Sequence, residues 1–184
     1  LFIFNAGARQ VEKPTLGIDE VIPDSAYLLE HKAKIKGVFL TSAINGCAGG
    51  LHHMLRELPE LPVYVSTTSG RFLKRKYKST GFFLRHLEFH YVWPRKIIKL
   101  GAVRIEVFAT NSEFPDSLGY AVYTQAGTVI VMGSNVCDFN KVSNHVVEVK
   151  HLSQIAKVQK VLLLVADAPY VGYVGYAVPK YQIN

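Results

Sequence analysis

Side chains that could do chemistry gather in the segment GVFLTSAINGCAGGLHHML at 37–55. Its small residues predict a turn between a buried strand and an amphipathic helix. Such turns often carry catalytic groups, because they aim side chains and helix N–H groups into one crevice. Among the residues at 42–48, however, only Cys47 can ionise. His52 and His53 follow on the helix, where adjacent side chains point in different directions and serve ordinary surface or core roles. The turn has the position of a site but few reactive groups.

Three serines, Ser42, Ser112 and Ser134, could act as nucleophiles only beside a general base. The sequence has no G-x-S-x-G motif and no fixed His or Asp partner for any of them. The GCAGGL segment could hold a phosphate at a helix N-terminus, but it lacks the Lys and Ser/Thr of a nucleotide-binding loop. We interpret these serines as small polar residues that fill space.

The strongest charge feature is basic. The formal net charge is +7, the pI is near 9.4, and the only acidic residue between 71 and 99 is Glu88. Basic residues interleaved with aromatic ones suit single-stranded nucleic acid, whose phosphates meet Lys and Arg while its bases stack. A solvated basic face, or one that meets an acidic protein, is the alternative. The candidate RNA-binding residues are Lys74, Arg75, Lys76, Lys78, Arg95 and Lys96, near Phe72, Tyr77 and Trp93.

Composition predicts one soluble, globular domain. Of the 184 residues, 49% are hydrophobic and 19% charged, which excludes a disordered chain. No apolar run approaches the ~18 residues of a membrane-spanning helix. Two cysteines, Cys47 and Cys137, favour a reducing compartment and a cytoplasmic location. We interpret both as small buried hydrophobic residues.

The elements that would position the turn alternate between strands and helices. Apolar runs predict buried strands at 1–4, 35–41 and 61–67, while residues 11–23 have no helical period and predict a long loop. This alternation predicts parallel strands with crossover helices. Three helices are expected. The first begins at Asp24 or Ser25 and has Tyr27, Leu28 and Ile35 on one side, the second follows the turn and ends at Pro59, and the third covers 69–78.

After residue 80 the pattern changes to successive strands at 82–92, 96–100, 102–110 and 119–133, with a hairpin turn at 125–127. A last helix at 147–158 and a buried strand at 160–168 follow. We therefore expect an α/β fold of layered, mixed sheets flanked by helices.

The order of these segments resembles the ribonuclease J family. The opening at 2–41, the segments LPVYVSTTSGRFLKRK and RIEVFATNSEFPDSLGYAVYTQAGTVIVMGS, and VLLLVADA match that family's motifs in sequence order. The resemblance implies a metallo-β-lactamase αββα sandwich, incomplete at both ends. It also implies that residues 1–184 are the N-terminal part of this domain, with a β-CASP domain and the remaining segments outside the chain.

The same resemblance indicates what has been replaced. The family binds two zinc or manganese ions through a His-x-His-x-Asp-His motif and further His and Asp ligands. Those positions fall on Ser42, Ile44, Gly46, Cys47, Ser112 and Ser134, and the Asp of an early Asp-x-Gly falls on Asn5. Of these side chains only Cys47 is a plausible ligand, and thiolate does not suit a hydroxide-bridged site that cleaves phosphate. We therefore predict no catalytic residues, no metal and no cofactor.

These observations predict a catalytically inactive ribonuclease J-like protein, either a non-catalytic subunit or an RNA-binding scaffold in RNA processing. Its expected partners are RNA and either an active ribonuclease J-type paralogue or a second copy of itself. No association with a membrane is expected. Two alternatives stay open. One is an active metal-dependent phosphodiester hydrolase with a centre rebuilt around Cys47, and the other is a purely protein–protein interaction module.

Overall fold

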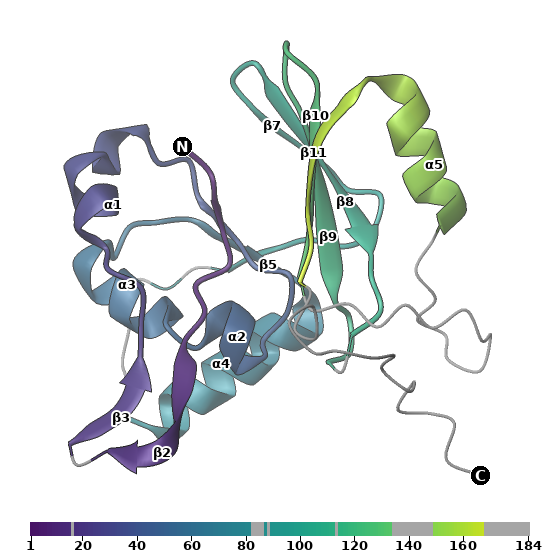
Figure 1. Ribbon diagram of the computed structural model, residues 1–184. Helices are drawn as coiled ribbons and strands as arrows, with labels where there is room; N and C mark the ends of the chain where they lie inside the picture. Colours follow the sequence, from purple (N-terminus) through teal and green to yellow (C-terminus); the bar gives the residue numbers. More distant parts are fainter. Residues whose placement is uncertain (16, 82–86, 88, 113, 134–148, 168–184) are drawn as a thin grey trace, which may run out of the picture.

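A computed structural model gives the fold, and it describes residues 1–184 apart from 16, 82–86, 88, 113, 134–148 and 168–184 (Figure 1). The N-terminal half forms a parallel four-stranded sheet in the order β1-β4-β5-β6. Its strands are short, and only β4 and β5 have a neighbouring strand on both sides. The four strands are β1 (Ile3–Phe4), β4 (Val38–Phe39), β5 (Val63–Val65) and β6 (Phe89–Tyr91).

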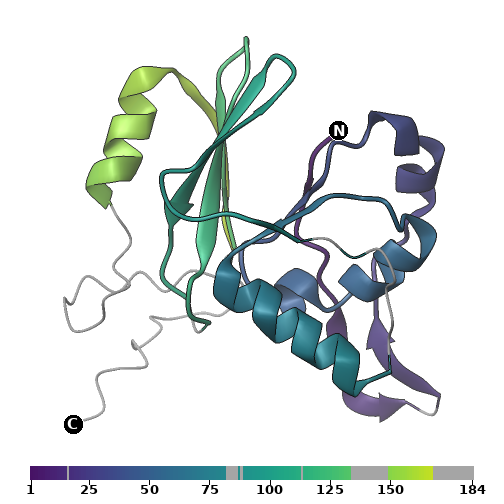
Figure 2. The same cartoon turned by 180° about the vertical axis from the view of Figure 1, so that it is seen from behind.

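Helices connect these strands, as parallel pairing requires. They are α1 (Ala26–Glu30), the 3-10 helix Lys32–Lys34, α2 (Asn45–Ala48), α3 (Leu51–Glu57) and α4 (Thr67–Ser79). The longest, α4, begins at Ser66, whose side chain accepts a hydrogen bond from the Ser69 N–H at 3.3 Å. Figure 2 shows α4 lying along the outer side of the N-terminal half. In the part of the chain that the structure describes, no helix is long and apolar enough to cross a membrane.

The C-terminal half is a five-stranded sheet in the order β11-β10-β9-β8-β7. Strands β7 to β10 form an antiparallel meander, and β11 pairs parallel to β10 after the crossover helix α5. The bounds are β7 (Ile97–Leu100), β8 (Val103–Ala109), β9 (Leu118–Tyr123), β10 (Thr128–Met132), α5 (Val149–Val158) and β11 (Val161–Val165). The predicted hairpin at 125–127 joins β9 to β10 and is confirmed, with Thr124 N–H bonded to the Gly127 carbonyl at 3.0 Å.

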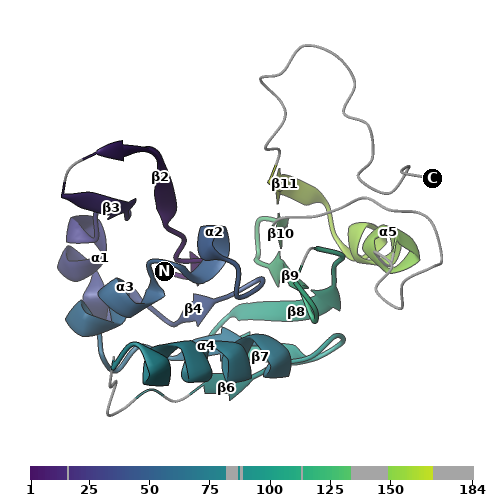
Figure 3. The ribbon, with the colours of Figure 1, turned by 90° about the horizontal axis from the view of Figure 1, so that it is seen from below.

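Alternation along the strands separates three hydrophobic layers. In β4 and the residue after it, Val38 and Leu40 face the helices, while Phe39 faces the other sheet. Phe39 packs there with Tyr120 and Ile105 of the five-stranded sheet. A third layer lies between that sheet and α5, which contributes Ile155. Helices, two sheets and a further helix thus stack in order (Figure 3), which confirms the predicted αββα sandwich of mixed sheets.

Four local predictions are wrong. The strand predicted to be buried at 1–4 is only partly buried, and Leu1 is 40% exposed. Residues 11–23 are not a loop but contain a β-hairpin, β2 (Arg9–Thr15) with β3 (Ile18–Val21), whose reversal uses Gly17 at φ 81°. Helix α1 ends after five residues and leaves Tyr27 58% exposed, because the Tyr27 ring stacks on His31 rather than on the core. Strand β11 forms as expected but is exposed rather than buried at 162–165.

Candidate functional site

The candidate site lies where strands of both sheets end. Asn5 follows β1, Thr41 follows β4, and the turn from β4 leads into α2. Two backbone bonds tie these segments together: Ala6 N–H donates to the Cys47 carbonyl at 2.7 Å, and Leu118 N–H donates to the Thr41 carbonyl at 2.8 Å. The turn at 42–47 therefore stands at the junction of the two sheets, in the position that the sequence predicts for a site.

A neutral hydrogen-bond network occupies this junction. The side-chain oxygen of Asn5 accepts from the backbone N–H of Thr41 at 2.9 Å and from its hydroxyl at 3.0 Å. The same hydroxyl lies 3.3 Å from the sulfur of buried Cys47. A Cβ on Gly133 would meet the Thr41 hydroxyl oxygen at 2.1 Å, so the end of β10 packs directly against it. Asn5 holds its position with φ 63°, in the left-handed region that Asn tolerates better than most residues.

The predicted ligand positions of the turn do not converge. Ser42 is buried, and its hydroxyl has no hydrogen-bond partner among the described residues. Ile44 precedes α2, Gly46 is exposed on its first turn, and Cys47 points into the buried network. The next residue along, Asn45, donates instead to Glu20 of β3 at 2.9 Å, which fastens the hairpin to the turn.

The β8–β9 loop forms the opposite rim of the junction. Ser112 contacts the Ser117 hydroxyl and accepts from the Phe114 N–H at 3.1 Å, so it is used within its own loop. Asp116 accepts a hydrogen bond from Thr68 in the first turn of α4. Ser134 and Cys137 lie outside the described residues.

These side chains do not fit a pair of divalent cations. Divalent ions that cleave phosphodiesters need carboxylate and imidazole donors, which also supply the negative charge that offsets the ions. The residues at the junction are an amide, hydroxyls and one thiol. Within the described ranges, no group of three or more His, Cys, Asp or Glu is placed to hold a metal.

His52 and His53 follow the turn on α3, where their rings are tilted at 42° to each other with centroids 3.8 Å apart. The Nδ1 of His52 lies 2.9 Å from the Gly49 carbonyl, which it reaches as a donor. Burial, and then the charge of His53, lowers the pKa of His52 below its ordinary value of 6.5. The two rings approach each other, so the prediction that these adjacent side chains point in different directions is wrong.

This pKa shift predicts a pH dependence of stability. Because the folded chain holds a proton on His52 less well than the unfolded chain, stability from this residue is complete above about pH 6.5 and falls as the pH drops. We expect His52→Gln to flatten the fall in free energy of unfolding between pH 7.5 and 5.5, measured by urea denaturation. His90→Gln, which removes an exposed imidazole from β6, is the control. An unchanged slope in His52→Gln would contradict the assignment.

The basic residues of α4 surround its solvent face. Ser69, Gly70, Leu73 and Tyr77 are buried against the sheet, so Tyr77 is a core residue rather than a stacking platform. At 100° per residue, Arg71, Arg75 and Lys78 lie opposite that buried face. Lys74 turns toward β6, with its ammonium 5.6 Å from the ring centroids of Phe89 and Tyr91, and Lys76 is also exposed.

Arg95 and Lys96 do not lie on this helix face. Lys96 follows β6, where its ammonium is 4.1 Å from the Trp93 ring centroid and donates to the Tyr91 carbonyl at 3.1 Å. Arg95 reaches over the outer face of the five-stranded sheet and contacts Nδ1 of His151 at 2.5 Å. The structure thus divides the six candidate RNA-binding residues between α4 and the connection from β6 to β7.

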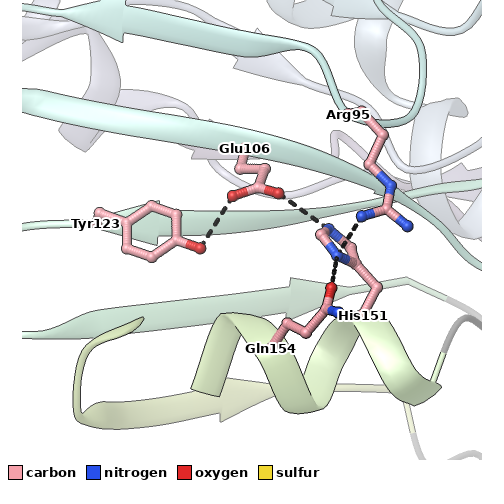
Figure 4. Close-up of polar contacts among 5 residues, drawn as sticks. All are labelled: Arg95, Glu106, Tyr123, His151 and Gln154. Atoms are coloured by element: carbon pink, nitrogen blue, oxygen red, sulfur yellow. Dashed lines mark hydrogen bonds and ion pairs between the residues drawn. The ribbon is translucent and has the colours of Figure 1, made fainter. Parts of the chain in front are cut away.

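Arg95 belongs to a polar network around buried His151 that the sequence does not reveal (Figure 4). His151 of α5 contacts the Glu106 carboxylate at 2.9 Å through Nε2, and the Tyr123 hydroxyl donates to the other Glu106 oxygen at 3.0 Å. The side-chain oxygen of Gln154 lies 3.3 Å from Nδ1 of His151. Burial, and then the bond to Glu106, raises the pKa of Tyr123 to about 12. Polar residues at alternate positions of β8 were the one available sequence signal.

Comparisons with known proteins agree with this architecture. Ribonuclease J 2 of Staphylococcus aureus (strain MRSA252) is 30% identical over 184 residues, which cover 100% of this chain and 32% of that protein. A protein of Mycoplasma pneumoniae named as an uncharacterized MG423 homolog is 29% identical over 191 residues, covering 99% of this chain and 33% of that protein. The chain therefore spans about a third of the length of the curated relatives it matches. No family model matches the sequence.

Solved structures with a similar fold are known. The crystal structure of a protein of unknown function from Enterococcus faecalis V583 aligns with a TM-score of 0.61 and 12% identity, covering 96% of this chain and 46% of that one. Rm3 metallo-beta-lactamase aligns with a TM-score of 0.50 and 15% identity, covering 73% and 58%. Sequence and fold together identify the chain as a homologue of the ribonuclease J family with the metallo-β-lactamase fold.

Proposed function

We propose that this chain is a non-catalytic ribonuclease J-like domain that binds RNA. The proposed absence of catalysis rests on the neutral hydrogen-bond network at the sheet junction. Asn5, Thr41 and Cys47 satisfy one another there, and Gly133 packs against Thr41, so the space is filled by hydrogen-bonded protein atoms. A two-metal mechanism needs ligands that clamp the attacking and leaving oxygens of the phosphate. The network supplies neither the ligands nor the charge.

The proposed RNA binding rests on α4 and on the relative from Staphylococcus aureus, which is named as a ribonuclease. Helix α4 carries five cations and no acidic residue, and its outermost side chains are Arg71, Arg75 and Lys78. Phe72 is 46% exposed beside them and is supported edge-on by Phe114 at a centroid distance of 5.3 Å. Exposed cations around a braced aromatic ring suit the phosphates and bases of a single strand. The same surface would serve a non-catalytic subunit beside an active paralogue.

A metal-binding test separates this proposal from a rebuilt active centre. We expect purified protein, dialysed against Mn²⁺ or Zn²⁺, to retain no stoichiometric metal by elemental analysis. We also expect no cleavage of a labelled RNA and no change in melting temperature on adding a chelator. A ribonuclease of known metal dependence serves as the positive control for cleavage. Stoichiometric metal together with cleavage that Cys47→Ala abolishes would overturn the inactive assignment and establish the rebuilt centre.

A further inference from the structure

A second set of cations lies on the outer face of the five-stranded sheet. Lys99 of β7 and Arg104 of β8 are direct cross-strand partners, so they share one face. Like charges placed opposite each other destabilise a strand pair, and the pair is therefore not there for stability. The guanidinium carbon of Arg104 lies over the Tyr123 ring, 3.9 Å from the centroid, and Lys99 is exposed.

Glu106, two residues along β8 from Arg104, does not neutralise this pair. One of its oxygens faces His151 at 2.9 Å and the other accepts from the Tyr123 hydroxyl at 3.0 Å, as Figure 4 shows. Among the described residues, no carboxylate lies within ion-pair distance of Lys99 or Arg104. The contacts with His151 and Tyr123 thus occupy the nearby negative charge and leave the two cations without a carboxylate partner.

The two basic surfaces are connected around one edge of the sandwich. Strands β6 and β7 are edge strands of their respective sheets, and the chain passes directly from one to the other. Along this edge Lys74 packs on the Tyr91 ring, and Lys96 bonds the Tyr91 carbonyl and covers one face of Trp93. The Trp93 side chain is 57% exposed. Cations and aromatic rings therefore continue from α4 to the outer face of the second sheet.

We propose that Lys99 and Arg104 form a second phosphate-contact site for the RNA strand that α4 binds, reached around the β6–β7 edge. This inference rests on the proposed RNA-binding function. A single strand suits the path, because its backbone bends freely and a base can stack on the exposed Trp93 ring. Arg104 is pre-positioned by Tyr123, so contact with a phosphate requires little additional ordering of its side chain.

The test measures how RNA affinity depends on salt. Fluorescence anisotropy with a labelled single-stranded 20-mer is recorded at several KCl concentrations for wild type and for K99Q/R104Q. Each phosphate contact with a single strand adds about 0.7 to the slope of log affinity against log salt, so we expect the double variant to lower the slope by about 1.4. K157Q/K160Q, which removes two exposed cations on and after α5, is the matched control and should keep the slope. R104K retains the charge and should lie close to wild type.

The outcomes distinguish the two proposals. If changes on α4 weaken binding while K99Q/R104Q matches K157Q/K160Q, the second site is wrong and the RNA-binding function stands. If wild type shows no salt-dependent affinity for the 20-mer, both are overturned. Poly-glutamate that binds wild type as tightly as RNA, and loses affinity in K99Q/R104Q, would assign the site to an acidic protein instead. Should the double variant unfold, K99Q alone, expected to lower the slope by about 0.7, decides the matter.

Discussion

Replacing Arg71, Arg75 and Lys78 with glutamine is expected to weaken RNA binding by roughly one to two orders of magnitude at low salt. These three side chains project from the solvent face of α4, opposite the residues buried against the sheet. Removing three phosphate contacts should lower the slope of log affinity against log salt by about 2. Filter binding or anisotropy with a single-stranded RNA at several salt concentrations measures both quantities.

The control for this prediction carries the same change in net charge. K32Q/K34Q/K36Q removes three exposed cations from the connection between α1 and β4. If binding depends on the α4 surface, this control retains most of the affinity. An equal loss in both triple variants would mean that net charge alone governs binding. Wild-type protein without measurable affinity would favour the protein–protein interaction module instead.

Phe39→Ala is expected to lower the free energy of unfolding by about 3–5 kcal/mol. Phe39 is fully buried between the two sheets, where its ring stacks on Tyr64 at a centroid distance of 4.5 Å and meets Tyr120 edge-on at 5.5 Å. Phe4 also packs against it at 5.4 Å. Truncation therefore removes the ring around which both sheets pack and leaves a cavity that these aromatic neighbours cannot fill.

Urea denaturation followed by tryptophan fluorescence and far-UV circular dichroism measures this loss. Tyr27→Ala removes an aromatic ring of similar size from an exposed position on α1 and should change stability by about 0.5 kcal/mol or less. A Phe39→Ala variant as stable as Tyr27→Ala would contradict the packing of the two sheets through Phe39.

The sequence predicted the layers of the fold because apolar periodicity reports burial directly. The change from alternating strands and helices to successive strands correctly separated the parallel sheet from the antiparallel meander. The hairpin of β2 and β3 was missed because Pro14 and the charged residues around it resemble a loop. The exposure of β11 was missed because a run of Val and Leu indicates a strand but not what covers it.

The sequence predicted the turn that carries the candidate site but not the hydrogen bonds that form there. The strand-to-helix turn fixed where Ser42 and Cys47 would lie, whereas the bond from Thr41 to Asn5 joins residues 36 positions apart. The contact of Arg95 with His151 spans 56 positions. Such pairs depend on which strands become neighbours in the fold, and the local patterns of one sequence do not show that pairing.

The unequal lengths of the strands have a consequence for how the chain folds. Strands β7 to β10 pair with their sequence neighbours through four to six consecutive residue pairs, so little loop entropy is lost when they meet. Strands β1 and β4 share only two pairs between residues 35 positions apart. We therefore expect the meander to gain amide protection first in pulse-labelled hydrogen exchange, and the parallel sheet to assemble afterwards on the surface that the meander presents.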